Sequence, residues 1–180
     1  MYVWTAVDLE DQLGEIKPQV RAIERELGFG DSALTLPFHI SLKISFSVSD
    51  ELYPDVIDTL FAYLRTVKPF DVHVSSIEME NSIVWIRMKE NTFLRQMHAD
   101  LDGILMERHG IRQHPYDLDF KFHTTLFLDP DGEKIRAAYF GIKELPIPAT
   151  LRANSLLIGV SESGAIGTYR VTHRIGMNVD

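Results

Sequence analysis

The sequence contains no cysteine, no long uncharged apolar run and no surplus of basic residues. Without cysteine, this chain of 180 residues has no disulfide, thiolate metal site or cysteine nucleophile, and we expect it in the reducing cytoplasm. No apolar stretch is long enough to cross a bilayer, and the first residues lack the basic leader and cleavage site of a signal peptide. We therefore expect no membrane association.

The charge balance is acidic, because 18 lysines and arginines stand against 26 aspartates and glutamates, for a formal net charge of -8. Proteins that hold long nucleic acids through many phosphates usually have a basic surface. The sequence thus argues against an extended nucleic-acid surface, whereas a small phosphate ester held in one pocket is compatible with this charge. The hydrophobic fraction of 45% allows a sizeable core.

Apolar periodicity predicts an α+β fold of short alternating elements. The predicted strands cover residues 1–8, 36–48, 120–128, 151–160 and 168–177, with a hairpin of 70–79 and 83–88, and the predicted helices cover 9–27, 50–67, 91–109 and 133–140. Ser49 or Asp50 is expected to cap the second helix. Helices mixed with hairpins favour α+β sheets over a doubly wound parallel sheet. No low-complexity linker divides the chain, so we expect a single domain over residues 1–180 and a monomer.

One short pattern occurs twice. Residues 38–42 read Phe-His-Ile-Ser-Leu and residues 122–126 read Phe-His-Thr-Thr-Leu. Because side chains alternate between the faces of a strand, His39 and Ser41 are expected on one face and their apolar neighbours on the other. His123 and Thr125 follow the same pattern. Each predicted strand is thus anchored by its apolar face and presents an imidazole beside a hydroxyl.

Two such pairs suit the cleavage of a phosphodiester without a metal ion. Histidine titrates near neutral pH, so one imidazole can activate the nucleophile while the other protonates the leaving oxygen. The hydroxyls of Ser41 and Thr125 can donate hydrogen bonds to the non-bridging phosphate oxygens. A single strand histidine is more often structural, but the paired pattern makes His39 and His123 the candidate catalytic residues. Which is the acid and which the base stays open.

These residues resemble the paired His-x-Ser/Thr-x motifs of the 2H phosphoesterase superfamily, which includes 2'-5' RNA ligase-like proteins and 2',3'-cyclic phosphodiesterases. Chain length, motif separation and element order are similar too, so the resemblance covers nearly the whole chain. It implies two pseudo-symmetric, intertwined lobes of antiparallel sheet with flanking helices around a central cleft. It also implies hydrolysis of a cyclic phosphate, commonly a 2',3'-cyclic nucleotide or RNA end. We expect no cofactor.

Four further residues are candidates for substrate binding. Lys43 is expected on the same face as the first motif histidine, where it could add positive charge near a phosphate or could be a solvated edge lysine. Arg112, His114 and Tyr116 lie in the loop before the second motif and could stack on or hydrogen-bond a base. Residues of these types are also common in surface loops without a ligand role.

Other titratable residues show weaker patterns. Asp117 and Asp119 match no strong metal-binding spacing, so we expect no metal site. Trp4 is expected in the core, as aromatic residues on strands usually are. The remaining histidines are expected to have structural or solvent roles; they are His73, His98, His109 and His173.

Two rival functions stay open. Some members of the resembling family join RNA through a 2'-5' linkage, and a basic patch along the cleft would favour that activity here. The same fold could also serve as a nucleotide- or RNA-binding module without turnover. The presence of all four motif residues disfavours this second rival.

Overall fold

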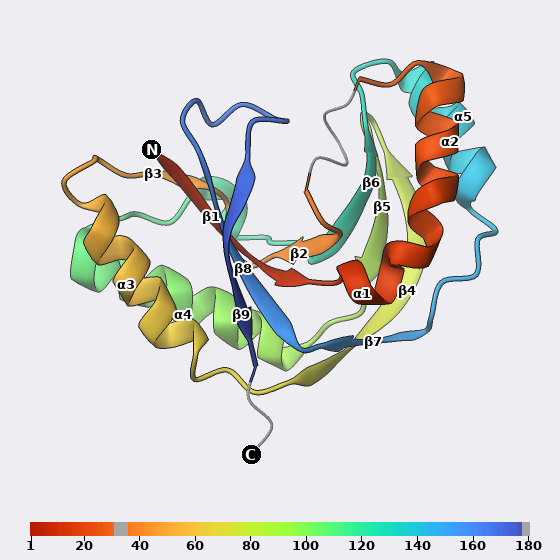
Figure 1. Cartoon of the computed structure of the whole chain (residues 1–180). Coiled ribbons are helices and arrows are strands. Elements are labelled where there is room, and N and C mark those ends of the chain that lie inside the picture. Colours follow the sequence, from red (N-terminus) through yellow and green to blue (C-terminus); the bar gives the residue numbers. More distant parts are fainter. Residues whose placement is uncertain (31–35, 178–180) are drawn as a thin grey trace.

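The computed structural model describes residues 1–30 and 36–177 and contains two curved antiparallel sheets (Figure 1). The first has the strand order β2-β1-β8-β9, with β3 also paired to β1, and the second has the order β6-β5-β4-β7. The bounds in the first sheet are β1 Tyr2–Asp8, β2 His39–Ser41, β3 Phe46–Ser47, β8 Ser155–Ser161 and β9 Arg170–Gly176. Those in the second are β4 Phe70–Glu80, β5 Ile83–Met88, β6 His123–Leu128 and β7 Thr150–Ala153.

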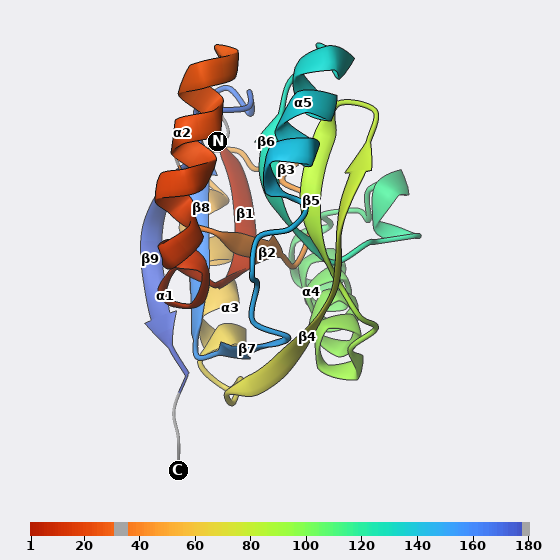
Figure 2. The same cartoon turned by 90° about the vertical axis from the view of Figure 1, so that its right-hand side faces the viewer.

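Helices flank both sheets, so the predicted α+β class is confirmed (Figure 2). Two of them, α3 and α4, lie against the first sheet, whereas α2 and α5 lie against the second (Figure 1). The helices are α1 Glu10–Leu13, α2 Lys17–Leu27, α3 Tyr53–Leu64, α4 Thr92–His109 and α5 Gly132–Ile142, with 3-10 turns η1 Gly14–Ile16 and η2 Pro115–Asp117. Within the described residues, no helix is both long and apolar enough to cross a membrane.

The first helical segment follows a strand of the first sheet but packs on the second. Just after α2, the ring of Phe29 lies 5.4 Å from that of Phe127 in β6, measured between centroids. Lys134 of α5 donates a hydrogen bond to the carbonyl oxygen of Gly28 at 2.8 Å. The segment that follows a strand of the first sheet therefore packs against elements of the second half of the fold.

The two motif strands are edge strands of different sheets, and they lie side by side where the sheets meet (Figure 1). The predicted alternation of faces is confirmed within each motif: Phe38, Ile40 and Leu42 are buried, while the histidine and serine between them are partly exposed. In the second motif, Phe122 and Leu126 are buried in the same way. The apolar faces join the core and leave the polar faces at the junction of the sheets.

Three predicted elements are interrupted. The predicted strand 36–48 is two short strands, β2 and β3, because residues 42–45 leave the extended conformation after Ser41. The predicted helix 9–27 breaks at the η1 turn and restarts with Pro18 in the first turn of α2, where a proline costs no hydrogen bond. The predicted strand 151–160 divides at Asn154, since β7 pairs with β4 and β8 pairs with β1.

Capping residues mark the ends of several helices. The predicted helix 91–109 is α4, and the oxygen of the Asn91 side chain caps it by accepting hydrogen bonds from two backbone amides. Gly28 ends α2 in the left-handed conformation, at φ 66°, which a residue with a side chain rarely adopts. The helix predicted from residue 50 begins later, at Tyr53, and its cap position is Leu52, but the predicted Ser49 hydroxyl accepts a hydrogen bond from the Leu52 amide at 3.3 Å in the turn before the helix.

Candidate active site

The two motif histidines are held in the same way. The Nδ1 atom of His39 donates to the carbonyl oxygen of Pro37 at 2.8 Å, and that of His123 donates to the carbonyl oxygen of Lys121 at 2.7 Å. A carbonyl oxygen only accepts, so each neutral imidazole carries its proton on Nδ1. Neither Nε2 atom has a hydrogen bond within residues 1–30 and 36–177. Each therefore has a lone pair for a ligand.

A tryptophan packs against each imidazole. The ring centroid of Trp4 lies 4.9 Å from that of His39, and the centroid of Trp85 lies 4.6 Å from that of His123. Trp4 and Trp85 are buried, so they limit the rotation of the histidine rings. Trp4 was predicted as a core residue, and its burial confirms this, but its contact with His39 was not predicted.

Two adjoining pockets contain the motif side chains. One, of about 260 Å³, is lined by His39 and by both motif hydroxyls, Ser41 and Thr125. The other, of about 520 Å³, is lined by His123. Both pockets are also lined by Ile44, so the four motif residues line two adjoining pockets at the junction of the sheets.

Burial lowers the pKa of both imidazoles below the ordinary value of 6.5. At His39, the hydrogen bond to Pro37 opposes this effect, the charge of His123 adds to it, and the charge of Asp8 opposes it. At His123, the carbonyl of Lys121 raises the pKa and the ammonium group of Lys121 lowers it. The two imidazoles lie within electrostatic range of each other, so a charge on His123 opposes protonation of His39.

The residues across the ladder from the two histidines have opposite charges. Asp8 of β1 is paired in register with His39, and Arg87 of β5 is paired in register with His123. The Asp8 carboxylate is buried and accepts hydrogen bonds from the Glu10 amide and the Ser155 hydroxyl. Sequence patterns did not single out Asp8 or Arg87, because the strand register that pairs them with the histidines depends on the tertiary fold.

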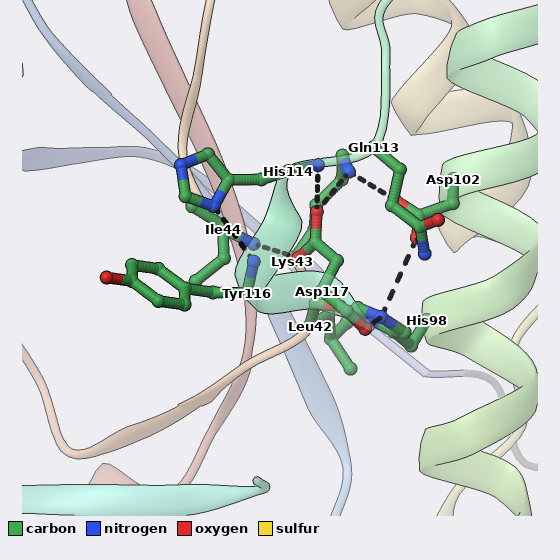
Figure 3. A network of polar contacts seen from close by, with 9 residues as sticks. All are labelled: Leu42, Lys43, Ile44, His98, Asp102, Gln113, His114, Tyr116 and Asp117. Atoms are coloured by element: carbon green, nitrogen blue, oxygen red, sulfur yellow. Dashed lines mark hydrogen bonds and ion pairs between the residues drawn. The ribbon is translucent and has the colours of Figure 1, made fainter. Parts of the chain in front are cut away.

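Lys43 is buried, which contradicts the alternative of a solvated edge lysine. Its side chain is 2% exposed, and its ammonium group donates to Asp117 at 3.0 Å and forms a second ion pair with Asp102 (Figure 3). Lys43 lines the pocket of His39, but two carboxylates match its charge. The sequence did not predict this burial, because the two carboxylates that pair with Lys43 lie 59 and 74 positions further along the chain.

The three loop candidates have different positions. Tyr116 lines the pocket of His123 and is 75% exposed. The side chain of His114 accepts a hydrogen bond from the backbone amide of Tyr116 and so helps to shape the turn. Arg112 is exposed and lines neither motif pocket. The structure therefore brings only Tyr116 of these three to the candidate site.

Structural contacts account for the histidines outside the motifs and the loop. The two ring nitrogens of His98 lie 2.7 Å from the carbonyl oxygen of Leu42 and 3.1 Å from that of Asp117. His109 bonds the hydroxyl of Thr59, and His73 bonds that of Thr150. His173 packs edge-on against Phe61. In the described part of the chain, no three histidine or acidic side chains converge as metal ligands would.

The family model of the 2'-5' RNA ligase superfamily matches residues 10–165. The chain therefore belongs to this superfamily, within the 2H phosphoesterases, and a phosphoesterase-type activity follows from membership. Among curated proteins, no sequence matches significantly.

Solved structures agree on the fold over nearly the whole chain. Thermus thermophilus TT0787 superposes with a TM-score of 0.63 at 15% identity, covering 98% of each chain. Escherichia coli LigT in complex with 3'-AMP gives 0.56 at 17% identity, again covering 98% of each chain. Kluyveromyces marxianus Usb1 gives 0.50 at 12% identity, with the same coverage. These similarities establish the shared two-lobed fold.

Proposed function

We propose that the protein hydrolyses a cyclic phosphodiester, such as the 2',3'-cyclic phosphate of a nucleotide or an RNA end, with His39 and His123 as the acid–base pair. One observation carries this proposal: the two imidazoles share the same Nδ1 anchor, have no Nε2 hydrogen bond within the described residues, and line adjoining pockets, one of which also contains Ser41 and Thr125. Such a pair can move both protons of a phosphoryl transfer without a metal ion.

In the proposed mechanism, Nε2 of one neutral histidine takes a proton from water while the water oxygen attacks phosphorus. The bond from phosphorus to one ester oxygen breaks, and the other histidine, which starts protonated, gives its Nε2 proton to that oxygen. The products are a phosphate monoester and a free hydroxyl. Ser41 and Thr125 donate hydrogen bonds to the non-bridging oxygens, where negative charge grows in the transition state. Proton exchange with solvent then resets the two histidines.

The charges near the two histidines favour one division of roles. The charge of Asp8 raises the pKa of His39 and so favours a protonated ring there, whereas the ammonium group of Lys121 lowers the pKa of His123 and so favours a neutral ring. We therefore assign His39 as the acid for the leaving oxygen and His123 as the base for water.

The pocket beside His123 suits a small nucleotide. Tyr116 and Leu118 are exposed apolar side chains on its lining, and a nucleobase can stack on such a surface. Structures of Escherichia coli LigT contain 3'-AMP, ATP or NADP+, which makes small nucleotides the first ligands to test on this related fold. The acidic net charge of -8 fits a compact substrate better than a long RNA.

The decisive experiment is incubation with each of the four 2',3'-cyclic nucleotides in the presence of a chelator, with products resolved by chromatography. We expect monophosphate to form in chelator, and His39→Ala or His123→Ala to reduce kcat by about 10²- to 10⁴-fold. A requirement for added metal, or activity that survives replacement of both histidines, would contradict the mechanism.

Two other results would indicate the rival functions. Tight nucleotide binding without product, across all four cyclic nucleotides, would identify a binding module. Joining of RNA ends through a 2'-5' linkage, with no hydrolysis of cyclic nucleotides, would identify a ligase. Both assays use the same protein and chelator conditions, so they separate the three activities directly.

A further inference from the structure

The loop before the second motif is fastened to the strand end after the first motif. We call residues 113–119 the pocket-edge segment. Within it, the Asp117 carboxylate accepts hydrogen bonds from the backbone amide of Ile44 at 3.2 Å and from that of His114 at 2.8 Å. The first bond joins the segment to the chain just after the first motif. The second lies within the segment and closes its turn. Asp117 is 3% exposed, so water contributes little to holding its charge.

Lys43 supplies the charge that balances this carboxylate. Its ammonium group donates to Asp117 at 3.0 Å and pairs with Asp102 of α4 (Figure 3). Burial raises the pKa of Asp117, but the hydrogen bonds from Lys43 and the two backbone amides hold it below its usual range. Asp117 is therefore ionised at neutral pH.

Helix α4 closes the network from the other side. Gln113, the first residue of the pocket-edge segment, donates to Asp102 at 2.8 Å. The imidazole of His98 lies between the carbonyl oxygens of Leu42 and Asp117, at 2.7 Å and 3.1 Å (Figure 3). The strand end, the helix and the segment thus share one buried polar network.

The opposite side of the pocket-edge segment faces the candidate site. Tyr116 and Leu118 are 75% and 77% exposed and line the pocket that contains His123. Large apolar side chains on a short loop hold a fixed position only when the backbone below them is restrained. In this segment, the network at Asp117 provides that restraint.

We propose that Lys43 is a positioning residue, whose ion pairs with Asp102 and Asp117 hold the pocket-edge segment where Tyr116 and Leu118 bind the substrate beside His123. The inference about the substrate rests on the proposed phosphodiesterase function. Lys43 then acts on substrate binding through the segment and does not contact the reacting phosphate. This differs from the expectation, based on the sequence, that Lys43 adds charge near a phosphate.

The first test measures amide hydrogen exchange of the full-length protein over residues 111–119. Lys43→Met leaves the buried carboxylate of Asp117 and the partly buried one of Asp102 without their cation, and we expect exchange in this stretch to become at least about tenfold faster, with the β4–β5 hairpin unchanged. Asp71→Asn is the matched control, because it removes the 2.9 Å ion pair with Arg152 away from both motif pockets. Unchanged exchange in Lys43→Met would overturn the proposal.

The second test separates KM from kcat with a 2',3'-cyclic nucleotide. We expect Lys43→Met to raise KM by about tenfold and to change kcat by less than about threefold, as the loss of a base contact would. A fall in kcat at constant KM would instead place Lys43 on the reacting phosphate and overturn the proposal. If Lys43→Met does not fold, Asp102→Asn tests the same network, because it removes one ion pair of Lys43 and leaves the one with Asp117. We expect this variant also to raise KM and to speed amide exchange in residues 111–119.

A failure of the proposed function would be distinguishable from a failure of this proposal. If the unmodified protein hydrolyses no cyclic nucleotide, binding of 3'-AMP can be followed through the fluorescence of Trp4 and Trp85, which contact the two histidines. A weaker Kd together with faster exchange in Lys43→Met would then support the positioning role without any turnover. An unchanged Kd would overturn it.

Discussion

Asp8 lies directly across the β1–β2 ladder from His39, so a buried carboxylate is paired in register with one of the two candidate catalytic imidazoles. Arg174 of β9 makes an ion pair with the same carboxylate at 2.5 Å. The matching position across from His123 is occupied by Arg87. The two motifs are alike in sequence and anchor, but their electrostatic surroundings are unequal.

Replacing Asp8 should lower the pKa of His39. The charge of Asp8 raises this pKa in the native protein, so Asp8→Asn removes a contribution that favours the imidazolium. Arg174→Met is the counterpart, because it frees the Asp8 charge and should shift the pKa of His39 upward. Titration of the histidine ring resonances by NMR measures both. Equal pKa values for His39 in the two variants would contradict the electrostatic division of roles.

The pH dependence of catalysis should be bell-shaped and centred below pH 6.5. The base must be neutral, so activity falls as pH drops below its pKa; the acid must be protonated, so activity falls as pH rises above its pKa. Burial lowers the pKa of both His39 and His123 below 6.5, which moves both limbs to the acidic side. The measurement is kcat/KM against pH with a cyclic nucleotide. A maximum above pH 7.5 would argue against these two groups as the titrating pair.

The motif hydroxyls should contribute to kcat. Ser41→Ala and Thr125→Val each remove one donor to the phosphate oxygens, and we expect each to reduce kcat by about 10²-fold. Thr125→Ser keeps the donor and should recover most of the activity. Steady-state kinetics of the three variants gives the comparison. If the serine variant, which keeps the hydroxyl, were as impaired as the valine variant, loss of the hydrogen-bond donor would not by itself explain the effect.

Removing the Tyr116 ring should weaken substrate binding. Tyr116→Ala takes away the exposed aromatic surface beside His123, and the loss of one base-stacking contact corresponds to an increase in KM of about tenfold. Phe140→Ala is a suitable control, since Phe140 is a 60% exposed aromatic residue on α5 that lines neither motif pocket. A comparable effect of both variants would show that the change is not specific to the pocket.

The Asp117 network should make stability sensitive to acid. The pKa of Asp117 is lowered in the folded state, so its contribution is complete above 3.8, the ordinary value, and is lost as pH falls from there through the folded pKa. Urea unfolding between pH 5 and pH 2 should therefore show a smaller loss of stability for Asp117→Asn than for the native chain. Parallel curves for the two proteins would contradict a lowered pKa.

Much of the candidate site was predictable because it depends on local patterns. The alternation of side chains within residues 38–42 and 122–126 placed both histidines and both hydroxyls on the partly exposed face, as the structure has them. The α+β class and the β4–β5 hairpin were also confirmed, the latter with its turn at Asn81, which has a φ of 42°. Roles for these side chains in catalysis stay predictions.

The features that sequence patterns missed depend on tertiary contacts. Lys43 appeared to continue the polar face of its strand, but the chain leaves the extended conformation after Ser41, and the lysine turns toward Asp102 and Asp117. Asn154 gives no signal that the chain passes there from one sheet to the other. The direction of the Lys43 side chain and the passage between the sheets at Asn154 both depend on contacts with residues that are distant in the sequence.

The packing of α2 against α5 has a mechanical consequence. Because α2 follows a strand of the first sheet yet lies on the second, opening the angle between the sheets would break contacts such as that of Phe29 with Phe127. The separation of the two imidazoles is therefore set when the chain folds. Changes to exposed side chains at the rim, such as Tyr116 and Leu118, should therefore alter access to the pocket of His123 without changing that separation.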